Sequence, residues 1–154
     1  MFIQENEIIK LRTVFNAEKK IVEKLTEFSK FEPDTIDVKK VNDYISLFEE
    51  IHEIQYTAFQ KKAIVKAMKS NIFILTGGPG TGKTTVIKGL VFVYAKYHQM
   101  PILYNDPLFD IKLIAPTGRA AKRMTETTNL HAETIHRFLG YSFDGKFTFN
   151  KDSL

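Results

Sequence analysis

Cysteine is missing from this sequence, and so are long hydrophobic runs. Without cysteine, the 154-residue chain can form neither disulfide bonds nor metal sites with thiolate ligands. Its apolar runs are much shorter than the roughly 20 residues of a membrane-spanning helix, and the N-terminus MFIQENEIIK lacks the basic and apolar blocks of a signal peptide. We therefore expect a soluble, cytoplasmic protein. A content of 44% hydrophobic residues suits one domain with a buried core.

Positive charge is scarce in the first part of the chain. Residues 1–55 hold 8 Lys and Arg against 12 Asp and Glu, whereas residues 56–154 hold 14 against 6. The basic part would favour a polyphosphate partner, either a nucleotide or a nucleic acid. A lysine-rich solvated surface explains the same counts, so charge alone does not decide between these two interpretations.

Helical periodicity dominates the first 70 residues, and we expect residues 1–55 to form an all-helical N-terminal segment. Apolar residues at three- and four-residue steps predict a helix over about residues 7–28. After a proline-containing break, Asp34 or Thr35 can cap a second helix. Its apolar face carries Val38, Val41, Ile45 and Phe48.

From residue 57 onward the pattern becomes that of an α/β protein. A helix over about residues 57–69 precedes NIFILT, residues 71–76, which reads as a strand buried on both faces. A largely apolar helix over residues 83–99 follows, with Gly89 as a small interior cost. IKLIA, residues 111–115, reads as a second buried strand. This order is a βαβ unit, so we expect the two strands to be parallel and joined by a right-handed crossover, in a sheet with flanking helices.

The last part of the chain shows weaker signals. A short helix is expected after Gly118, and a further helix over HAETIHRFLG, ending at Gly140. Asp144 and Gly145, flanked by alternating aromatic residues, predict a hairpin turn.

A glycine-rich loop gives the strongest functional signal. Residues 77–84, GGPGTGKT, match G-x-x-x-x-G-K-[ST] at every required position. Glycines let consecutive N–H groups curl around a phosphate, and the next helix adds its unpaired first-turn N–H groups. Lys83 can reach the β- and γ-phosphates and the Thr84 hydroxyl can ligate Mg²⁺, so these two are the candidate catalytic residues. The predicted nucleotide site consists of Gly77, Gly78, Pro79, Gly80, Thr81, Gly82, Lys83, Thr84 and Thr85.

Two segments on either side of the glycine loop help to identify the class of P-loop protein. Gln60 lies near the start of a predicted helix, and its amide could donate to and accept from the edge of adenine, although a lone glutamine on a helix is usually just solvated. Downstream, LIAPTGRAAKRM puts Thr117, Gly118 and Arg119 at the carboxyl end of a predicted strand, where open α/β sheets bind ligands. This loop could hold a nucleic-acid phosphate or be a basic, solvated helix turn.

In this order the motifs resemble those of RecD-like superfamily 1 DNA helicases, the group that includes the exodeoxyribonuclease V alpha chain. YTAFQKKAI is similar to the Q motif of that family, LTGGPGTGKTT to motif I, IKLIAPTGRAAKRM to motif Ia, and AETIHRFLG to the segment that follows. The resemblance covers roughly residues 8–141.

The resemblance implies the first RecA-like motor domain of an ATP-dependent DNA helicase that moves 5′ to 3′ and serves DNA repair or recombination. ATP and Mg²⁺ would be its cofactors, and single-stranded DNA and other repair subunits its partners. It implies that Gln60 contacts adenine. The residues implied along the DNA are Pro116, Thr117, Gly118, Arg119, Thr134, Ile135 and His136; His136 could instead be an ordinary surface histidine.

An acidic Walker B box is missing as well. ATP hydrolysis in this family needs a strand ending in Asp-Glu, and Asp106, in a turn-rich segment, is a poor substitute. We expect residues 56–154 to be a partial motor domain, truncated before this box, that binds nucleotide but hydrolyses little. Two alternatives stay open: a stand-alone nucleotide- or nucleic-acid-binding module, and another type of P-loop ATPase or kinase.

Overall fold

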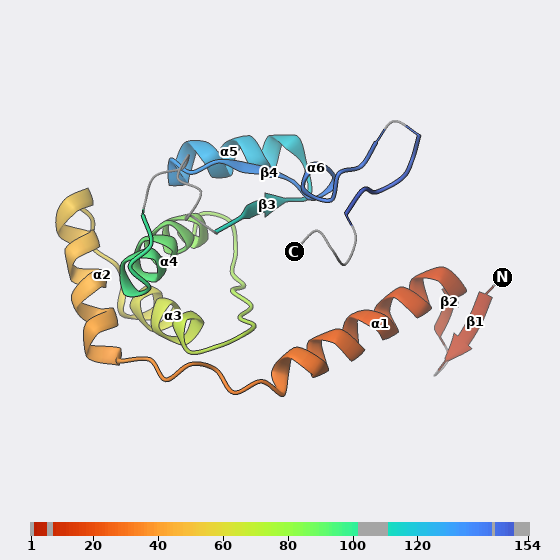
Figure 1. The fold of residues 1–154 in the computed structure, drawn as a ribbon, viewed down its shortest axis with the longest axis horizontal. Helices are drawn as coiled ribbons and strands as arrows, with labels where there is room; N and C mark the ends of the chain where they lie inside the picture. The colour runs from red at the N-terminus through yellow and green to blue at the C-terminus, as the bar shows by residue number, and fades with distance from the viewer. Residues whose placement is uncertain (1, 6–7, 102–110, 143, 150–154) are drawn as a thin grey trace.

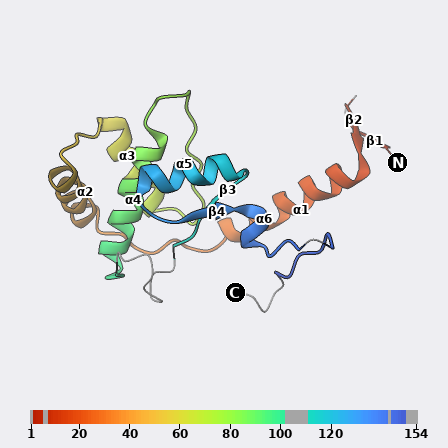
Figure 2. The same ribbon diagram turned by 90° about the horizontal axis from the view of Figure 1, so that it is seen from above.

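The computed structural model describes residues 2–5, 8–101, 111–142 and 144–149, so Asp106 lies outside the described residues. Figures 1 and 2 show the arrangement of the elements. In chain order these are β1 (Phe2–Glu5), β2 (Ile8–Leu11), α1 (Arg12–Ser29), α2 (Val38–His52), α3 (Ala58–Met68), α4 (Lys83–Tyr97), β3 (Leu113–Ala115), α5 (Gly118–Thr128), β4 (Ala132–Thr134) and α6 (Ile135–Phe138). No helix in the described part of the chain has the length and apolar character needed to cross a membrane.

A strand pair stands where the sequence predicted the start of a helix. β1 and β2 pair antiparallel, with Phe2 opposite Leu11, and α1 begins only at Arg12. The expected all-helical N-terminal segment is therefore wrong for these strands. Neighbouring isoleucines at positions 8 and 9 fit a helical stripe, but β-branched side chains also favour an extended backbone.

Helix α1 is amphipathic, but it contacts none of the other described helices. Every residue of α1 is described and none is buried, and Val22 and Phe28 are more than half exposed. Figures 1 and 2 show α1 and the strand pair extending away from the other helices. We call β1, β2 and α1 together the N-terminal arm. The Asn71 side chain donates to the carbonyl oxygen of Phe31 at 2.7 Å, which connects the segment after the arm to the segment that follows α3.

Helices α2, α3 and α4 share the main hydrophobic core. Its buried side chains come from all three helices and from Tyr56, which precedes α3: Val41, Ile45, Phe48, Tyr56, Ile64, Met68, Val86 and Val93. Asp37 caps α2 by accepting from the N–H groups of Lys39 and Lys40 at 2.9 and 3.3 Å. The caps predicted at Asp34 and Thr35 are wrong because α2 begins at Val38.

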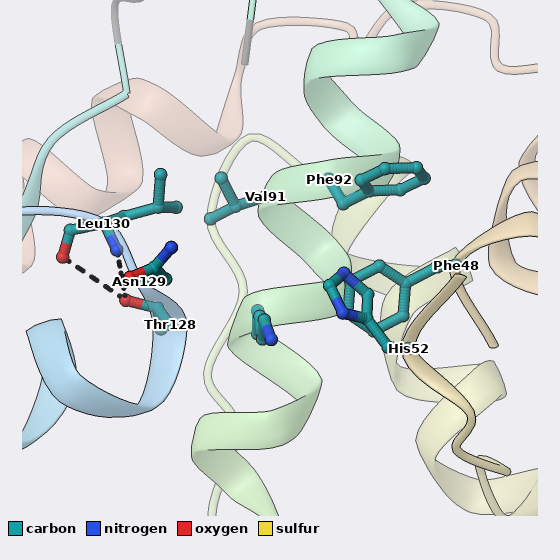
Figure 3. A pocket seen from close by; sticks show the side chains of 8 residues that line it. Phe48, His52, Val91, Phe92, Thr128, Asn129 and Leu130 are labelled. Atoms are coloured by element: carbon teal, nitrogen blue, oxygen red, sulfur yellow. Dashed lines mark hydrogen bonds between the residues drawn. The ribbon is translucent and has the colours of Figure 1, made fainter. Parts of the chain in front are cut away.

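A small pocket of about 180 Å³ lies where α2 and α4 meet the turn after α5. Figure 3 shows Phe48 and His52 on one side and Thr128, Asn129 and Leu130 on the other. The His52 ring lies 4.3 Å from the Phe48 ring, centroid to centroid. Burial, together with the charge of Lys88, lowers the pKa of His52. None of the predicted site residues lines this pocket.

The predicted strand over residues 71–76 is wrong as a strand buried on both faces. The segment has no ladder partner in the part of the chain that the structure describes, and Ile72 and Ile74 are 40% and 76% exposed. A strand is stabilised by hydrogen bonds to a neighbouring strand, so an apolar run without such a neighbour stays irregular. The predicted crossover from a strand at residues 71–76 to a parallel strand at residues 111–115 is therefore not formed in the described residues.

The parallel pair lies one element further along the chain. β3 pairs in parallel with β4, with Leu113 opposite Ala132 and Ala115 opposite Thr134, and α5 connects the two strands (Figure 1). The helix predicted over HAETIHRFLG is therefore half wrong, since its first half is β4. Thr134 ends this strand and also caps α6 by accepting from the Arg137 N–H at 3.1 Å.

The hairpin turn at Asp144 and Gly145 is confirmed in the described residues. Tyr141 and Phe147 form an antiparallel bridge, and the Ser142 N–H donates to the Lys146 carbonyl at 2.9 Å. Gly145 has φ of 77°, a value that glycine adopts without strain.

Candidate nucleotide site and nucleic-acid edge

The glycine loop curls back on itself between residue 76 and the start of α4. Gly80 and Gly82 have φ of 76° and 78°, in the left-handed region where other residues are strained. The Thr81 hydroxyl donates to the Gly78 carbonyl at 2.9 Å and closes the turn. An added Cβ at Gly80 would meet nothing within 4 Å, so the reason for this glycine is its backbone conformation.

The start of α4 differs from that of its neighbours. Asp37, Thr57, Thr117 and Thr134 cap α2, α3, α5 and α6 with side-chain oxygens. Helix α4 begins after Gly82, which offers no side-chain cap. The first-turn N–H groups of α4 are left for an external acceptor, and the positive end of the helix dipole favours an anion.

Lys83 folds over the loop that precedes it. Its ammonium donates to the carbonyl oxygens of Gly77 at 2.8 Å and Gly78 at 2.6 Å. The Thr81 hydroxyl lies 3.5 Å from the same nitrogen. An ammonium has three protons and a flexible stem, so Lys83 can turn from these carbonyls to a phosphate without moving the backbone.

Gln60 lies directly beside the loop. Its Oε1 accepts from the Thr57 N–H at 2.9 Å, while the Thr57 hydroxyl accepts from the Gln60 N–H at 3.3 Å, which makes a capping box. Its Nε2 faces Gly82, where an added Cβ would lie 2.6 Å away. One lone pair of the Gln60 amide oxygen, which was expected to be available for adenine, is thus used in the cap of α3.

These residues fit a nucleoside triphosphate. The loop has glycines where the backbone turns with positive φ, a lysine that folds over the loop, and an uncapped helix start. Thr84, in the first turn of α4, carries the hydroxyl that would complete the coordination of a phosphate-bound Mg²⁺. Within the described residues, no group of three His, Asp or Glu side chains could hold a metal ion.

The predicted DNA-contacting residues form one edge. Pro116 to Arg119 follow β3, and Thr134 to His136 lie at the end of β4 and in α6. Because Ala115 lies opposite Thr134 in the parallel ladder, the two segments leave the sheet side by side. The structure therefore brings together two sets of residues that the sequence keeps apart.

Basic side chains and a groove lie along this edge. Arg119, His136 and Arg137 are exposed, and the Arg137 guanidinium lies 3.8 Å from the Glu133 carboxylate. A groove of about 430 Å³ runs between α5 and β4, lined by Lys122, Glu133, Thr134 and Arg137 among others. Phosphate oxygens could be reached here by side chains and by N–H groups.

Three residues around the loop were not picked out from the sequence: Glu49, Tyr56 and Lys61. The Tyr56 hydroxyl donates to the Thr85 carbonyl at 2.6 Å. Glu49 accepts from the Tyr56 N–H and from the Lys61 ammonium, each at 2.6 Å. The one available signal was Gly89, an interior glycine whose missing side chain makes room for Tyr56.

The loop, its lysine and the uncapped helix define a P-loop nucleotide-binding protein. The model of a family described as "AAA domain" matches residues 60–153. The chain belongs to this family of P-loop NTPases, and its sequence is similar to those of RecD and RecD2 proteins.

The similar proteins differ in how much of this chain their alignments cover. It is 33% identical to the RecBCD enzyme subunit RecD of Buchnera aphidicola, over 95% of this chain and 25% of that protein. It is 36% identical to RecD of Mycobacterium tuberculosis, over 57% of this chain and 18% of that protein. It is 40% identical to the ATP-dependent RecD2 DNA helicase of Deinococcus radiodurans, over 48% and 9% respectively. The chain thus spans a quarter or less of the length of these relatives.

Proposed function

We propose that this chain is the ATP-binding part of an ATP-dependent DNA helicase of the RecD type. The main support for this proposal is the glycine loop at the uncapped start of α4, with Lys83 folded over the loop. Gln60 beside Gly82 supports a site for the adenine base next to the phosphate site. The names of the relatives, RecD and RecD2 DNA helicase, supply the class of reaction.

The wider assignment is proposed on the same grounds. The described strands β3 and β4, with the flanking helices α4 and α5, would be part of a RecA-like motor domain. The whole protein would act in the cytoplasm, move 5′ to 3′ along DNA in repair or recombination, and work with partner subunits. By itself this chain would bind nucleotide and hydrolyse it slowly, because its sequence contains no strand ending in Asp-Glu to hold Mg²⁺ and orient water.

Each loop residue has a separate part in the proposed binding. The N–H groups of residues 80–85 bind the phosphate oxygens, and Lys83 leaves the Gly77 and Gly78 carbonyls to neutralise charge on the β- and γ-phosphates. Mg²⁺ would supply positive charge that offsets the charge of the phosphates. Thr84 would hold this ion, and Gln60 would orient the base.

Lys83→Ala tests the nucleotide site. We expect ATP affinity to fall about tenfold to a hundredfold, the loss of a hydrogen bond to a charged group of about 1.5–3 kcal/mol. The measurement is calorimetric titration of the chain with MgATP. Lys96→Ala is the matched control, because Lys96 is an exposed lysine near the other end of α4. Equal affinities for the two variants would exclude the proposed site.

Arg119→Ala tests the proposed DNA edge. We expect weaker binding of single-stranded DNA at low salt, and a slope of log affinity against log salt that is smaller by about 0.7, as for one lost phosphate contact. Fluorescence anisotropy with a labelled oligonucleotide measures both. Arg12→Ala removes the same charge from the start of α1 and should keep the wild-type slope. A slope changed equally by both variants would reflect total charge only, and would count against this edge.

A further inference from the structure

Tyr56 connects the two helices that flank the proposed nucleotide site. It directly precedes Thr57, the cap of α3, and only 6% of it is exposed. Its ring stacks on Phe48 with centroids 5.8 Å apart and planes 13° from parallel. Its hydroxyl donates to the Thr85 carbonyl, in the first turn of α4, at 2.6 Å. One side chain thus joins the start of α3 to the start of α4.

Gly89 shows how closely Tyr56 packs against α4. A Cβ built on Gly89 would overlap the Tyr56 hydroxyl and lie 2.9 Å from the ring carbon that bears it. Glycine in a helix interior is less favourable than alanine by about 1 kcal/mol. Gly89 therefore lowers the stability of the helix, but its lack of a side chain allows the Tyr56 ring to approach the helix closely.

Glu49, from α2, fixes Tyr56 from the other side. One carboxylate oxygen accepts from the Tyr56 N–H and the other from the Lys61 ammonium, each at 2.6 Å. Lys61 follows Gln60 directly, and the Glu49 side chain is only 13% exposed. The start of α3, with Gln60 on it, is therefore held by α2 and by α4 together.

We infer that Tyr56 is a positioning residue for nucleotide binding, which holds Gln60 on α3 and the phosphate loop at the start of α4 at one fixed separation. The inference rests on the proposed function. Gln60 Nε2 faces Gly82, the residue that directly precedes α4. A nucleoside triphosphate that contacts both must match this separation, because its base and its phosphates are joined by a ribose of fixed length.

This role separates two kinds of ligand. ATP would contact both Gln60 and the loop, so it is sensitive to their separation. Inorganic tripolyphosphate would contact the loop alone. A residue that sets the separation affects the first ligand more than the second, whereas a residue that only stabilises the fold affects both alike.

The test is Tyr56→Phe in the full 154-residue chain. Calorimetric titrations with MgATP and with magnesium tripolyphosphate give the two affinities, and thermal unfolding shows that the variant is folded at the titration temperature. We expect the dissociation constant for ATP to rise about twofold to tenfold, as for one lost neutral hydrogen bond. The constant for tripolyphosphate should stay the same within error.

Tyr97→Phe is the matched control. The Tyr97 hydroxyl accepts from the Asp37 N–H at 2.9 Å, at the other end of α4. The same substitution there should leave both affinities unchanged. Gly89→Ala is a second variant that disturbs the Tyr56 contact from the side of α4, and it should weaken ATP more than tripolyphosphate.

The outcomes distinguish the inference from the function on which it rests. If Tyr56→Phe leaves both affinities unchanged, or weakens both ligands equally, the inference is overturned while the nucleotide site stands. If the wild-type chain binds neither ligand, the proposed function is wrong and the inference falls with it. A loss confined to ATP in Tyr56→Phe and absent in Tyr97→Phe supports the inference.

Discussion

The Glu49 carboxylate, near the candidate site, accepts two hydrogen bonds, one from the Tyr56 N–H and one from the Lys61 ammonium. Burial raises its pKa, but the Lys61 hydrogen bond, the Tyr56 N–H and the charge of Lys61 together lower it further than burial raises it. The net result is a pKa below the usual value of 4.5. A carboxylate held in this way favours the folded state only while it is ionised.

This depressed pKa predicts how stability depends on pH. Because Glu49 releases its proton more readily in the folded than in the unfolded chain, its contribution is complete above about pH 4.5 and is lost as pH falls through the lower folded value. We expect the destabilisation caused by Glu49→Gln to be largest at neutral pH and to shrink below pH 4.5. Urea unfolding from pH 7 to pH 3 measures it.

The control for this prediction is Glu50→Gln, at the exposed neighbouring position. It removes an equal charge outside the contacts with Tyr56 and Lys61, and its effect on stability should change less with pH. A constant difference between wild type and Glu49→Gln across the whole range would contradict the assigned role of Glu49.

At the scale of helices and strands, local signals were predictable and strand partners were not. The phosphate loop is contiguous, so its residues could be predicted from spacing alone, and the start of α3 near Thr57 could be predicted from the helical pattern. The prediction that residues 71–76 form a buried strand parallel to the next one rested on their apolar composition and on the order of the elements, and neither of these specifies a hydrogen-bonding partner. β4 was missed because Thr134 both ends this short strand and caps α6, so strand and helix signals merge. The contact between Tyr56 and Gly89 joins distant positions with no shared motif.

The turn between α5 and β4 aligns the two segments of the proposed DNA edge. Asn129 adopts a left-handed conformation with φ of 58° at the end of α5. The Thr128 hydroxyl, on a residue only 3% exposed, accepts from the Leu130 N–H at 3.2 Å and donates to the Met124 carbonyl at 2.7 Å. This single hydroxyl therefore supports the turn that leads the chain into β4.

Thr128→Val tests the importance of this turn. Valine keeps the shape of threonine but leaves the buried Leu130 N–H without its acceptor, so we expect a loss of about 1–3 kcal/mol in unfolding free energy. Chemical denaturation measures the loss. Thr127→Val is the matched control, because the Thr127 hydroxyl donates to the Arg123 carbonyl at an exposed position, and it should change stability by less than about 0.5 kcal/mol. Equal losses in both variants would mean that the turn has no special need for the Thr128 hydroxyl.

At the scale of the whole molecule, the two parts of the acidic N-terminal region differ in burial. α1 has no buried residue, although all of it is described, and Figure 1 shows it lying apart from the other helices. α2 contributes Val41, Ile45 and Phe48 to the core shared with α3 and α4. The boundary predicted at residue 55 stays a prediction, but this packing favours a boundary between α1 and α2.

Two deletions decide between these boundaries. Removal of residues 1–31 takes away the arm and its contact with Asn71, and we expect the main unfolding transition and ATP affinity to stay close to those of the full chain. Removal of residues 1–55 also removes Val41, Ile45 and Phe48, each about 0–1% exposed. Truncation of a single large buried side chain costs about 2–5 kcal/mol, and a domain has only about 5–15 kcal/mol in total, so this shorter chain should not fold cooperatively. Differential scanning calorimetry measures both. A cooperative transition after removal of residues 1–55 would establish residues 56–154 as an independent domain, and would mean that α2 belongs with the arm.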